Sequence, residues 1–247
     1  MIDLSSFERD MRVAIIGASG GIGTALIDSL VAHDNVSQIC SLSRQNIPHR
    51  SPKLFNLAFD FTDEDSIITA ANAMHEAGDY DLIIVATGLL QGQGITPEKN
   101  LRALSHDGFE QSFLVNTIGP AMTAKHMLPL LARDRKTVFA ILSARVGSIS
   151  DNRLGGWYAY RASKAALNMV IKTLAIEHAR RFKNSAIIGL HPGTVDTALS
   201  QPFQGNVPDG KLFTPTQSAS YLLNVVNSIG SNDTGDVFDW DGKKVPA

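Results

Sequence analysis

Cysteine is almost absent from this sequence, in which Cys40 is the single cysteine among 247 residues. One thiol forms no disulfide within the chain, and this excludes the small secreted domains that depend on disulfides for stability. Cys40 lies in a short apolar run typical of a buried strand, where a thiol packs as a small hydrophobic group and is inert as a nucleophile. We therefore expect a protein of a reducing, cytoplasmic compartment.

An excess of charge of one sign is also missing. The 22 Lys and Arg residues nearly balance the 24 Asp and Glu residues, which gives a formal net charge of −2 at pH 7. This balance argues against a nucleic-acid partner, and no basic run suggests a membrane surface. No apolar segment approaches the roughly 20 residues that span a bilayer. Residues 1–10 lack the basic start and apolar stretch of a signal peptide. We expect neither a nucleic acid nor a membrane as a partner.

Strands and helices alternate along the chain, a pattern typical of a parallel sheet covered by helices on both faces. A chain of this length with 44% hydrophobic residues buries one sizeable core. We expect an α/β fold, namely a single Rossmann-type domain over 1–247 with a doubly wound parallel sheet of about seven strands. Strands are predicted at 12–17, 37–42, 54–58, 81–86, 136–142, 185–190 and 235–239, and helices at 21–32, 63–77, 109–132, 158–182 and 215–229.

A glycine-rich turn follows the first predicted strand. The sequence Gly17-Ala-Ser-Gly-Gly-Ile-Gly23 connects that strand to a helix-like segment. Glycines let the backbone approach a pyrophosphate, and the N-terminus of the helix presents unpaired N–H groups to it. The spacing is GxxxGxG, which differs from the GxGxxG of the broader dinucleotide fingerprint. The turn indicates a nucleotide-phosphate site, with a tight strand-to-helix connection as the competing interpretation.

A tyrosine and a lysine four residues apart, Tyr160 and Lys164, lie in the helical segment 158–182. Residues at this spacing share one face of a helix. The ammonium group would stabilise the phenolate and lower the pKa of the tyrosine. Such a phenol can pass a proton to or from a carbonyl or an alcohol near neutral pH. The pair alone is a weak signal, because YxxxK also occurs in helices where both side chains are solvated.

Together the two motifs resemble those of the short-chain dehydrogenase/reductase family, where a GxxxGxG turn near the N-terminus precedes YxxxK in the second half of the domain. Here Gly17 opens the first motif and Tyr160 opens the second, and their separation is similar to that in the family. The resemblance covers nearly the whole chain, and phrases such as Gly155-Gly-Trp-Tyr-Ala-Tyr160 are similar to the branch of C-factor-like proteins and sniffer-type carbonyl reductases. It implies an NAD(P)-dependent oxidoreductase that acts on carbonyl or alcohol groups, with a dinucleotide-binding part at roughly 11–142 and a catalytic and substrate part at roughly 143–247.

The resemblance also implies the roles of individual residues. Tyr160 is implied as the proton donor and acceptor, Lys164 as the group that lowers its pKa and bonds the nicotinamide ribose, and Asn116 as the holder of a water that links the lysine to solvent. Hydride transfer itself is the chemistry of the cofactor. The residues implied in cofactor binding are Gly17, Ser19, Gly21, Ile22, Gly23, Ser43, Arg44, Asp60, Phe61, Ala86, Thr87, Gly88, Tyr160, Lys164, Pro192, Gly193, Val195 and Thr197.

The catalytic serine of the family has no clear counterpart here. In the family it follows the fifth strand, a short and nearly fixed distance before the tyrosine, and bonds the substrate oxygen. A gapless match places Ala144 at that position. Ser143 is the nearest hydroxyl to this position but precedes Tyr160 by a longer gap than in the family, whereas Ser148 has the better spacing and lies further from the strand end. We assign the role to Ser143, with Ser148, or neither serine, as the alternatives.

Ser43 and Arg44 end the second predicted strand, where an NAD-preferring enzyme usually has an acid that binds the ribose hydroxyls. A serine there removes the repulsion toward a 2′-phosphate, and Arg44 can pair with that phosphate. Gly20 stands where many NADP-dependent enzymes carry a further basic residue. We predict a preference for NADPH over NADH, with NAD(H) as the alternative cofactor, and we expect no metal site.

Two irregular segments, 89–100 and 198–214, follow strands and are expected to form the walls of the substrate pocket. Neither contains a cluster of charges that points to an anionic substrate. Trp157 and Trp240 receive no role from the sequence.

Apolar stripes on the helices 109–132 and 158–182 predict core packing, and the resemblance implies a homodimer or homotetramer formed through these helices. The unclear serine leaves an alternative to an enzyme. That alternative is a C-factor-like signalling or regulatory protein that binds the dinucleotide with little or no turnover.

Overall fold

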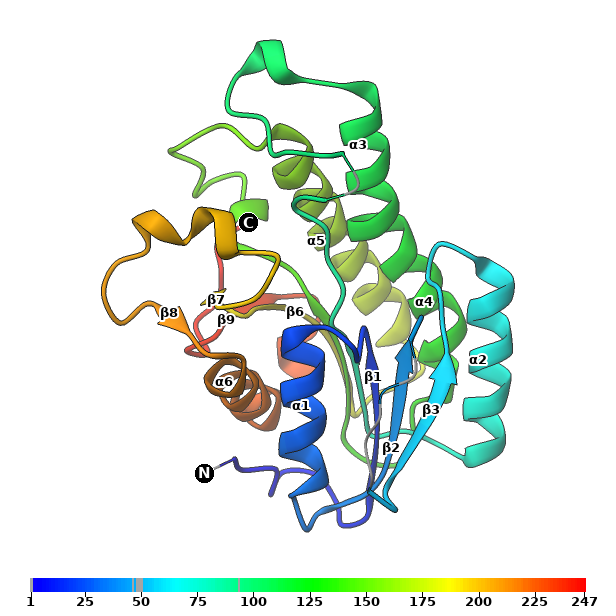
Figure 1. Cartoon of the computed structure of the whole chain (residues 1–247). Helices are drawn as coiled ribbons and strands as arrows, with labels where there is room; N and C mark the ends of the chain where they lie inside the picture. The colour runs from blue at the N-terminus through cyan, green and yellow to red at the C-terminus, as the bar shows by residue number, and fades with distance from the viewer. Residues whose placement is uncertain (1, 46, 48–50, 93) are drawn as a thin grey trace.

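Seven parallel strands form the central sheet of the computed structural model, which describes residues 2–45, 47, 51–92 and 94–247 (Figure 1). The order across the sheet is β3-β2-β1-β4-β5-β6-β9. The predicted Rossmann-type α/β fold is confirmed, and each strand lies within two residues of its predicted bounds. The strands are β1 Met11–Ile16, β2 Val36–Ser43, β3 Leu54–Ala58, β4 Leu82–Val85, β5 Thr137–Leu142, β6 Ser185–His191 and β9 Val237–Asp239.

The direction of winding reverses at β1, which pairs with β2 on one side and with β4 on the other. In a doubly wound sheet this reversal opens a crevice outside the carboxyl ends of the two central strands. Every residue of β4 and β5 is buried, because helices cover the parallel sheet on both faces. The loops that follow β1 and β4 therefore begin from rigid, buried strands.

Helices cover the sheet in two layers (Figure 1). On one face, α1 Gly21–Val31 packs with α6 Pro215–Ser228, and Leu26 and Leu222 are fully buried there. On the other face, α2 Glu64–Ala77 lies with α4 Gly119–Met127 and α5 Tyr158–His178.

The long helix predicted at 109–132 is wrong as a single element. The structure instead has α3 His106–Phe113, a π-helical turn Leu114–Ile118, α4, and a short 3₁₀ turn Leu128–Leu130. The π turn coincides with the bonds of the Asn116 side chain to the backbone of Leu89. Such turns add a residue to one turn of a helix and occur often at functional sites.

In their described residues, the two segments predicted as irregular contain only short pieces of regular structure. Segment 198–214 includes a 3₁₀ turn, Gln201–Asn206, and the two-residue strand β8 Leu212–Phe213, which pairs with β7 Thr194–Val195. Gln91 Nε2 donates to Ala198 O at 3.3 Å, so segment 89–100 contacts segment 198–214. The two expected pocket walls are therefore neighbours.

Cys40 lies in β2 and is fully buried. Burial raises the pKa of its thiol to about 12, so the thiol stays protonated and inert near neutral pH. Within the described ranges, no helix combines the length and the apolar character that a membrane span requires.

Candidate functional site

The glycine turn after β1 packs its backbone directly against the end of β4. Gly17 has a φ of 81°, and a Cβ there would lie 2.7 Å from Ala86 O. A Cβ on Gly23 would lie 2.3 Å from Gly17 O. Both distances are shorter than a side chain tolerates, so the turn requires glycine at these two positions.

The N-terminus of α1 faces the crevice with its backbone N–H groups. Gly20 caps it without a side-chain hydrogen bond, and its first turn contains no acidic residue among the described positions 20–24. A helix N-terminus with these properties favours an anion such as a phosphate.

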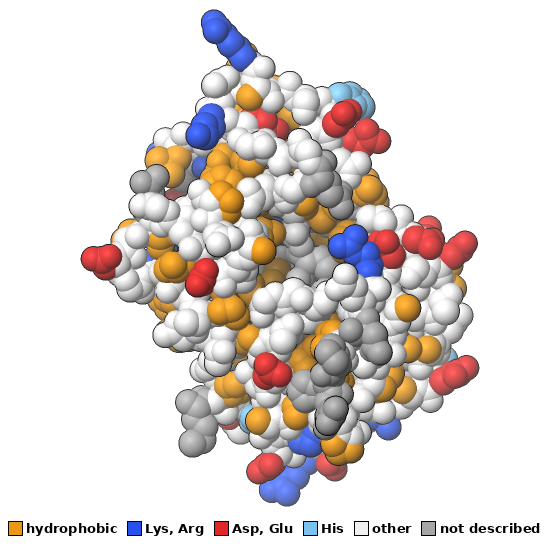
Figure 2. All heavy atoms as spheres, viewed as in Figure 1, with side chains coloured by type: hydrophobic (Ala, Val, Ile, Leu, Met, Phe, Trp, Pro, Cys, Tyr) orange, Lys and Arg blue, Asp and Glu red, His pale blue; other side chains and the backbone are white. Residues whose placement is uncertain are grey.

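A pocket of about 370 Å³ opens beside the glycine turn. Figure 2 shows that this face of the molecule is hollowed near its centre, with hydrophobic side chains around the hollow. The residues predicted for cofactor binding that line the pocket are Gly17, Ser19, Ser43, Arg44, Asp60, Phe61, Ala86, Thr87 and Gly88. The lining residues that the sequence reasoning missed are Gly20, Phe59, Thr62, Leu89, Gln111, Leu114 and Val115.

Two polar groups of this pocket fit a bound nucleotide. Thr87 Oγ1 is buried without a hydrogen-bond partner among the described residues, and buried polar groups of this kind normally have a partner. Asp60 Oδ1 accepts hydrogen bonds from the Thr62 backbone N at 3.0 Å and from its Oγ1 at 2.7 Å. These bonds, with a smaller contribution from the nearby Arg44, lower the pKa of Asp60. The carboxylate therefore stays ionised and able to accept from an amino group.

The remaining predicted cofactor residues of the turn, of α1 and of the loop after β6 do not line this pocket. A Cβ on Gly21 would meet Thr197 Cγ2 at 2.8 Å, so the loop after β6 borders the first turn of α1. Gly193 has a φ of 76° and packs on the Phe213 ring. The backbone O of Pro192 accepts from Ser218 Oγ at 3.0 Å. Ile22 packs against the hydrophobic core under α1, and Val195 is buried in β7.

Tyr160 and Lys164 lie one turn apart on α5, with Lys164 Nζ 6.0 Å from the centre of the Tyr160 ring. Lys164 is 2% exposed, and its Nζ donates to Leu142 O at 2.8 Å. Leu142 is the last residue of β5, so this bond holds the pair at the carboxyl edge of the sheet. A Cβ on Gly88, which lines the pocket beside the glycine turn, would lie 3.8 Å from Lys164 Nζ. The amine therefore lies beside that pocket.

Burial controls the protonation of both groups. It raises the pKa of Tyr160 to about 12 and lowers the pKa of Lys164 to about 7. The sequence predicted a lowered pKa for the tyrosine, and the direction is the opposite. Burial disfavours the charged form of each group, the phenolate of Tyr160 and the ammonium of Lys164.

Asn116 is fully buried in the π-helical turn and its donors are both used. Its Nδ2 donates to Leu89 O at 2.8 Å and to Ser163 Oγ at 3.1 Å, and its Oδ1 accepts from Leu89 N at 2.8 Å. An amide oxygen has two lone pairs, so Oδ1 retains one acceptor position. Asn116 therefore ties segment 89–100 to α5.

The two candidate serines both have partners within the protein. Ser143 is buried, and its Oγ donates to Asn168 Oδ1 on α5 at 2.6 Å. Ser148 Oγ accepts from Asp151 N at 3.1 Å and donates to Ala247 O at 3.4 Å. The sequence reasoning did not identify Asn168 as a partner of Ser143. The feature that could have indicated it is its position one helical turn after Lys164.

His191 also received no role from the sequence reasoning. It ends β6, pairs in register with Asp239 of β9, and precedes the Pro-Gly loop. Its Nδ1 is buried without a partner among the described residues. Burial lowers the pKa of His191 to about 4, although Asp239 acts in the opposite direction. His191 is therefore neutral near pH 7.

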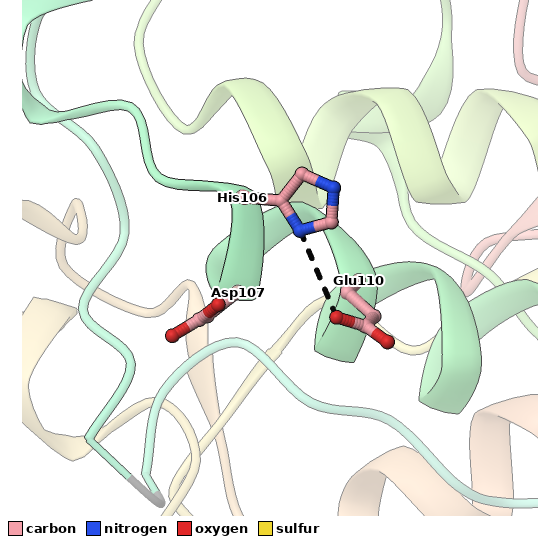
Figure 3. Close-up of side chains that lie close together, drawn as sticks. All are labelled: His106, Asp107 and Glu110. Atoms are coloured by element: carbon pink, nitrogen blue, oxygen red, sulfur yellow. Dashed lines mark ion pairs between the residues drawn. The ribbon is translucent and has the colours of Figure 1, made fainter.

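Three exposed side chains, His106, Asp107 and Glu110, gather at the start of α3 (Figure 3). His106 Nδ1 lies 3.7 Å from Glu110 Oε2, four residues along the helix, and the two side chains are 92% and 66% exposed. Asp107 lies in the first turn, where the helix dipole favours a carboxylate. The clustering of these three side chains is therefore explained by their stabilisation of the start of α3.

A family model described as short chain dehydrogenase matches residues 11–207. The chain belongs to this family. Family membership makes it an oxidoreductase that uses a nicotinamide dinucleotide.

Relatives of this short-chain dehydrogenase include two curated proteins. The 1-hydroxy-2-glutathionyl-2-methyl-3-butene dehydrogenase of Rhodococcus sp. (strain AD45) is 31% identical over 183 residues, which is 74% of this chain and 76% of that protein. C-signal of Myxococcus xanthus is 34% identical over 136 residues, which is 55% of this chain and 76% of C-signal.

Two solved structures share the fold along nearly the whole chain. The NADPH-bound carbonyl reductase from chicken fatty liver matches with a TM-score of 0.83 and 22% identity, over 98% of this chain and 97% of that one. The carbonyl reductase Sniffer of D. melanogaster matches with a TM-score of 0.83 and 19% identity, over 97% of this chain and 100% of its own. At these identities the likeness concerns the fold.

The buried amine makes the stability of the protein depend on pH. Above pH 7 the folded Lys164 is neutral, whereas the unfolded lysine stays protonated up to its ordinary pKa of 10.5. The unfolded state then binds more protons, so the contribution of Lys164 to the free energy of unfolding rises with pH between about 7 and 10.5. Lys164→Met is expected to remove this rise, which amounts to a few kcal/mol, on the order of 1.4 kcal/mol per pKa unit.

Urea unfolding at pH 7 and pH 9 measures the effect. Lys172→Met, at an exposed lysine two turns further along α5, is the matched control and should keep the pH dependence of the unchanged protein. The same pH dependence in Lys164→Met would contradict the burial of a titrating amine.

Proposed function

We propose that this short-chain dehydrogenase is an NADP(H)-dependent oxidoreductase for a carbonyl or alcohol group, with Tyr160 as proton donor and acceptor. The observation that carries the proposal is the Tyr160–Lys164 pair, which the bond to Leu142 O holds at the carboxyl edge of the sheet beside the dinucleotide pocket. We further propose a single domain over 1–247 and a small-molecule substrate.

The residues that line the pocket would bind the cofactor through hydrogen bonds to its phosphates and its adenine. The N–H groups at the start of α1 would face the pyrophosphate, and the Asp60 carboxylate would accept from the adenine amino group. Thr87 Oγ1 would gain the hydrogen-bond partner that it does not have among the described residues. When bound, the dinucleotide supplies the hydride that reduces a carbonyl carbon, or accepts it from an alcohol.

The side chains of the protein then handle the proton. In reduction, the substrate oxygen gains the phenolic proton of Tyr160 as its carbon gains the hydride, so that a carbonyl compound becomes an alcohol. Lys164 would bond the ribose and, in its protonated form, which predominates below about pH 7, would stabilise the phenolate that remains. The remaining lone pair of Asn116 Oδ1 would hold the water that links Lys164 to solvent.

Ser143 remains our candidate for the hydrogen bond to the substrate oxygen. Its proton is donated to Asn168 Oδ1, so the hydroxyl must turn away from Asn168 before it donates to a substrate. A donor that must first reorganise stabilises developing charge less than a preorganised one does. Modest turnover follows from this arrangement.

A second candidate function is a dinucleotide-binding signalling protein with little or no turnover. The 34% identity to C-signal over about half of this chain favours it, as do the internal partners of both serines. The intact Tyr160–Lys164 pair favours the enzyme.

Tyr160→Phe separates the two functions. It removes the phenolic proton but keeps the ring, so we expect NADPH binding to change less than threefold and carbonyl reduction to fall at least a hundredfold. Fluorescence titration with NADPH and the loss of NADPH absorbance with an aldehyde measure the two quantities. Unchanged reduction would refute the role of Tyr160, and binding without reduction in the unmodified protein would favour the signalling function.

Arg44 is proposed to pair with the 2′-phosphate of NADP(H). It is exposed at the wall of the pocket, next to the buried Ser43. Arg44→Asp would place a carboxylate near that phosphate and should lower the NADPH/NADH affinity ratio at least tenfold. Parallel titrations with NADPH and NADH measure the ratio, and an unchanged ratio would reject the assignment.

A homodimer or homotetramer is proposed through α4 and α5. A groove of about 790 Å³ runs along these helices, and it is lined in part by Ile176, which is 58% exposed. Exposed apolar side chains beside a groove are typical of an interface. Ile176→Glu should convert the oligomer to monomers in light scattering, whereas Leu101→Glu, at an apolar residue exposed elsewhere, should not. A monomeric unmodified protein would rule the proposal out.

A further inference from the structure

Trp157 has a backbone conformation that tryptophan rarely adopts. Its φ and ψ are 52° and 45°, and it follows Gly155 and Gly156, whose φ values are 62° and 65°. The two glycines adopt the left-handed region without strain, but a residue with a Cβ is destabilised there. Strained residues persist where their surroundings hold them, and they concentrate at functional sites.

The surroundings hold Trp157 from both sides. On one side, its backbone N donates to Glu98 O at 2.5 Å, and the buried Glu98 carboxylate accepts from Ala159 N at 3.3 Å. On the other side, Arg161 Nε donates to the backbone O of Gly156 at 3.0 Å. Glu98 therefore serves as the cap that the α5 N-terminus does not obtain from its own N-cap side chain.

This backbone places the indole ring beside Tyr160. The centres of the Trp157 and Tyr160 rings lie 6.3 Å apart with planes at 72°, and those of Trp157 and Phe203 lie 5.1 Å apart at 64°. Both are edge-to-face arrangements that aromatic rings prefer. Phe203 comes from segment 198–214, so the indole joins the proposed proton donor to a pocket wall.

On the side of Trp157 and Phe203, the side chains next to Tyr160 are aromatic. Lys211 Nζ lies 5.0 Å from the centre of the Trp240 ring, but within the described part of the chain no such cation contact is found for Trp157. A flat apolar group attached to a carbonyl matches these two aromatic side chains, and the cation near the Tyr160 ring is Lys164 Nζ, at 6.0 Å from the ring centre.

We propose that Trp157, together with Phe203, determines substrate specificity and selects carbonyl compounds with an aromatic or similarly flat apolar group next to the carbonyl. The inference rests on the proposed function, because it needs Tyr160 to act on the substrate oxygen. It adds the class of substrate and the side chains that recognise it.

Trp157→Gly is the sharpest test, because glycine adopts the observed backbone conformation without strain and the variant keeps the bond to Glu98 O. Benzaldehyde and propanal are the two probes, with NADPH as the reductant. We expect the unmodified protein to favour benzaldehyde at least tenfold in kcat/KM. Trp157→Gly should lower this value at least tenfold, mainly through KM, and change it less than threefold for propanal.

Two controls separate recognition from folding and from cofactor binding. Trp157→Phe keeps an aromatic ring and should retain most of the preference for benzaldehyde. NADPH affinity by fluorescence titration should change less than twofold in both variants. A weakened NADPH affinity would mean that the indole contacts the cofactor, and this would overturn the inference.

The remaining outcomes distinguish the failure of the role of Trp157 from the failure of the proposed reductase. Equal losses for both aldehydes, or no loss at all, would overturn the role of Trp157 in specificity and leave the proposed function standing. Failure of the unmodified protein to reduce either aldehyde while it binds NADPH would overturn the proposed reductase and the inference with it.

Discussion

The hydrogen bond from Lys164 Nζ to Leu142 O joins the helix of Tyr160 to the end of β5. An amine that is 2% exposed loses its hydration, so it needs a partner within the protein, and the last carbonyl of a buried strand supplies one. The neighbouring loop packs tightly around it, because a Cβ on Gly147 would lie 2.9 Å from the backbone carbonyl carbon of Lys164. Strand, loop and helix are therefore in direct contact here, and this contact sets the position of Tyr160 relative to the pocket.

The sequence alone predicted the strands and the glycine turn correctly. It did not predict local structure that depends on a contact with a residue far along the chain. Apolar runs such as β5 are local signals, and the close approach of Gly23 to Gly17 O requires glycine whatever surrounds it. The π-helical turn differs, because it accompanies the bonds of Asn116 to Leu89, which lies 27 residues earlier in the chain. The spacing of apolar residues within 109–132 does not indicate that contact.

The serine could not be assigned by counting residues, because the direction of a side chain follows from the strand before it. Phe139 and Ile141 point toward the face of the sheet that α5 covers, and Ser143 continues this alternation and meets Asn168 there. The pKa of Tyr160 was equally hidden, since its direction depends on burial by segments that the motif does not contain.

Tyr160 lies between two anchors that come from different parts of the chain. Glu98 holds the first turn of α5 through Ala159 N, and Leu142 O holds the next turn through Lys164. The strain at Trp157 has a structural reason in this frame, because the same Glu98 that caps the helix accepts from the Trp157 backbone and thereby sets its direction. Burial keeps the phenol protonated near neutral pH, with a pKa of about 12, and a protonated phenol is a donor. In the reduction proposed above, Tyr160 would therefore hold the proton that the substrate oxygen gains.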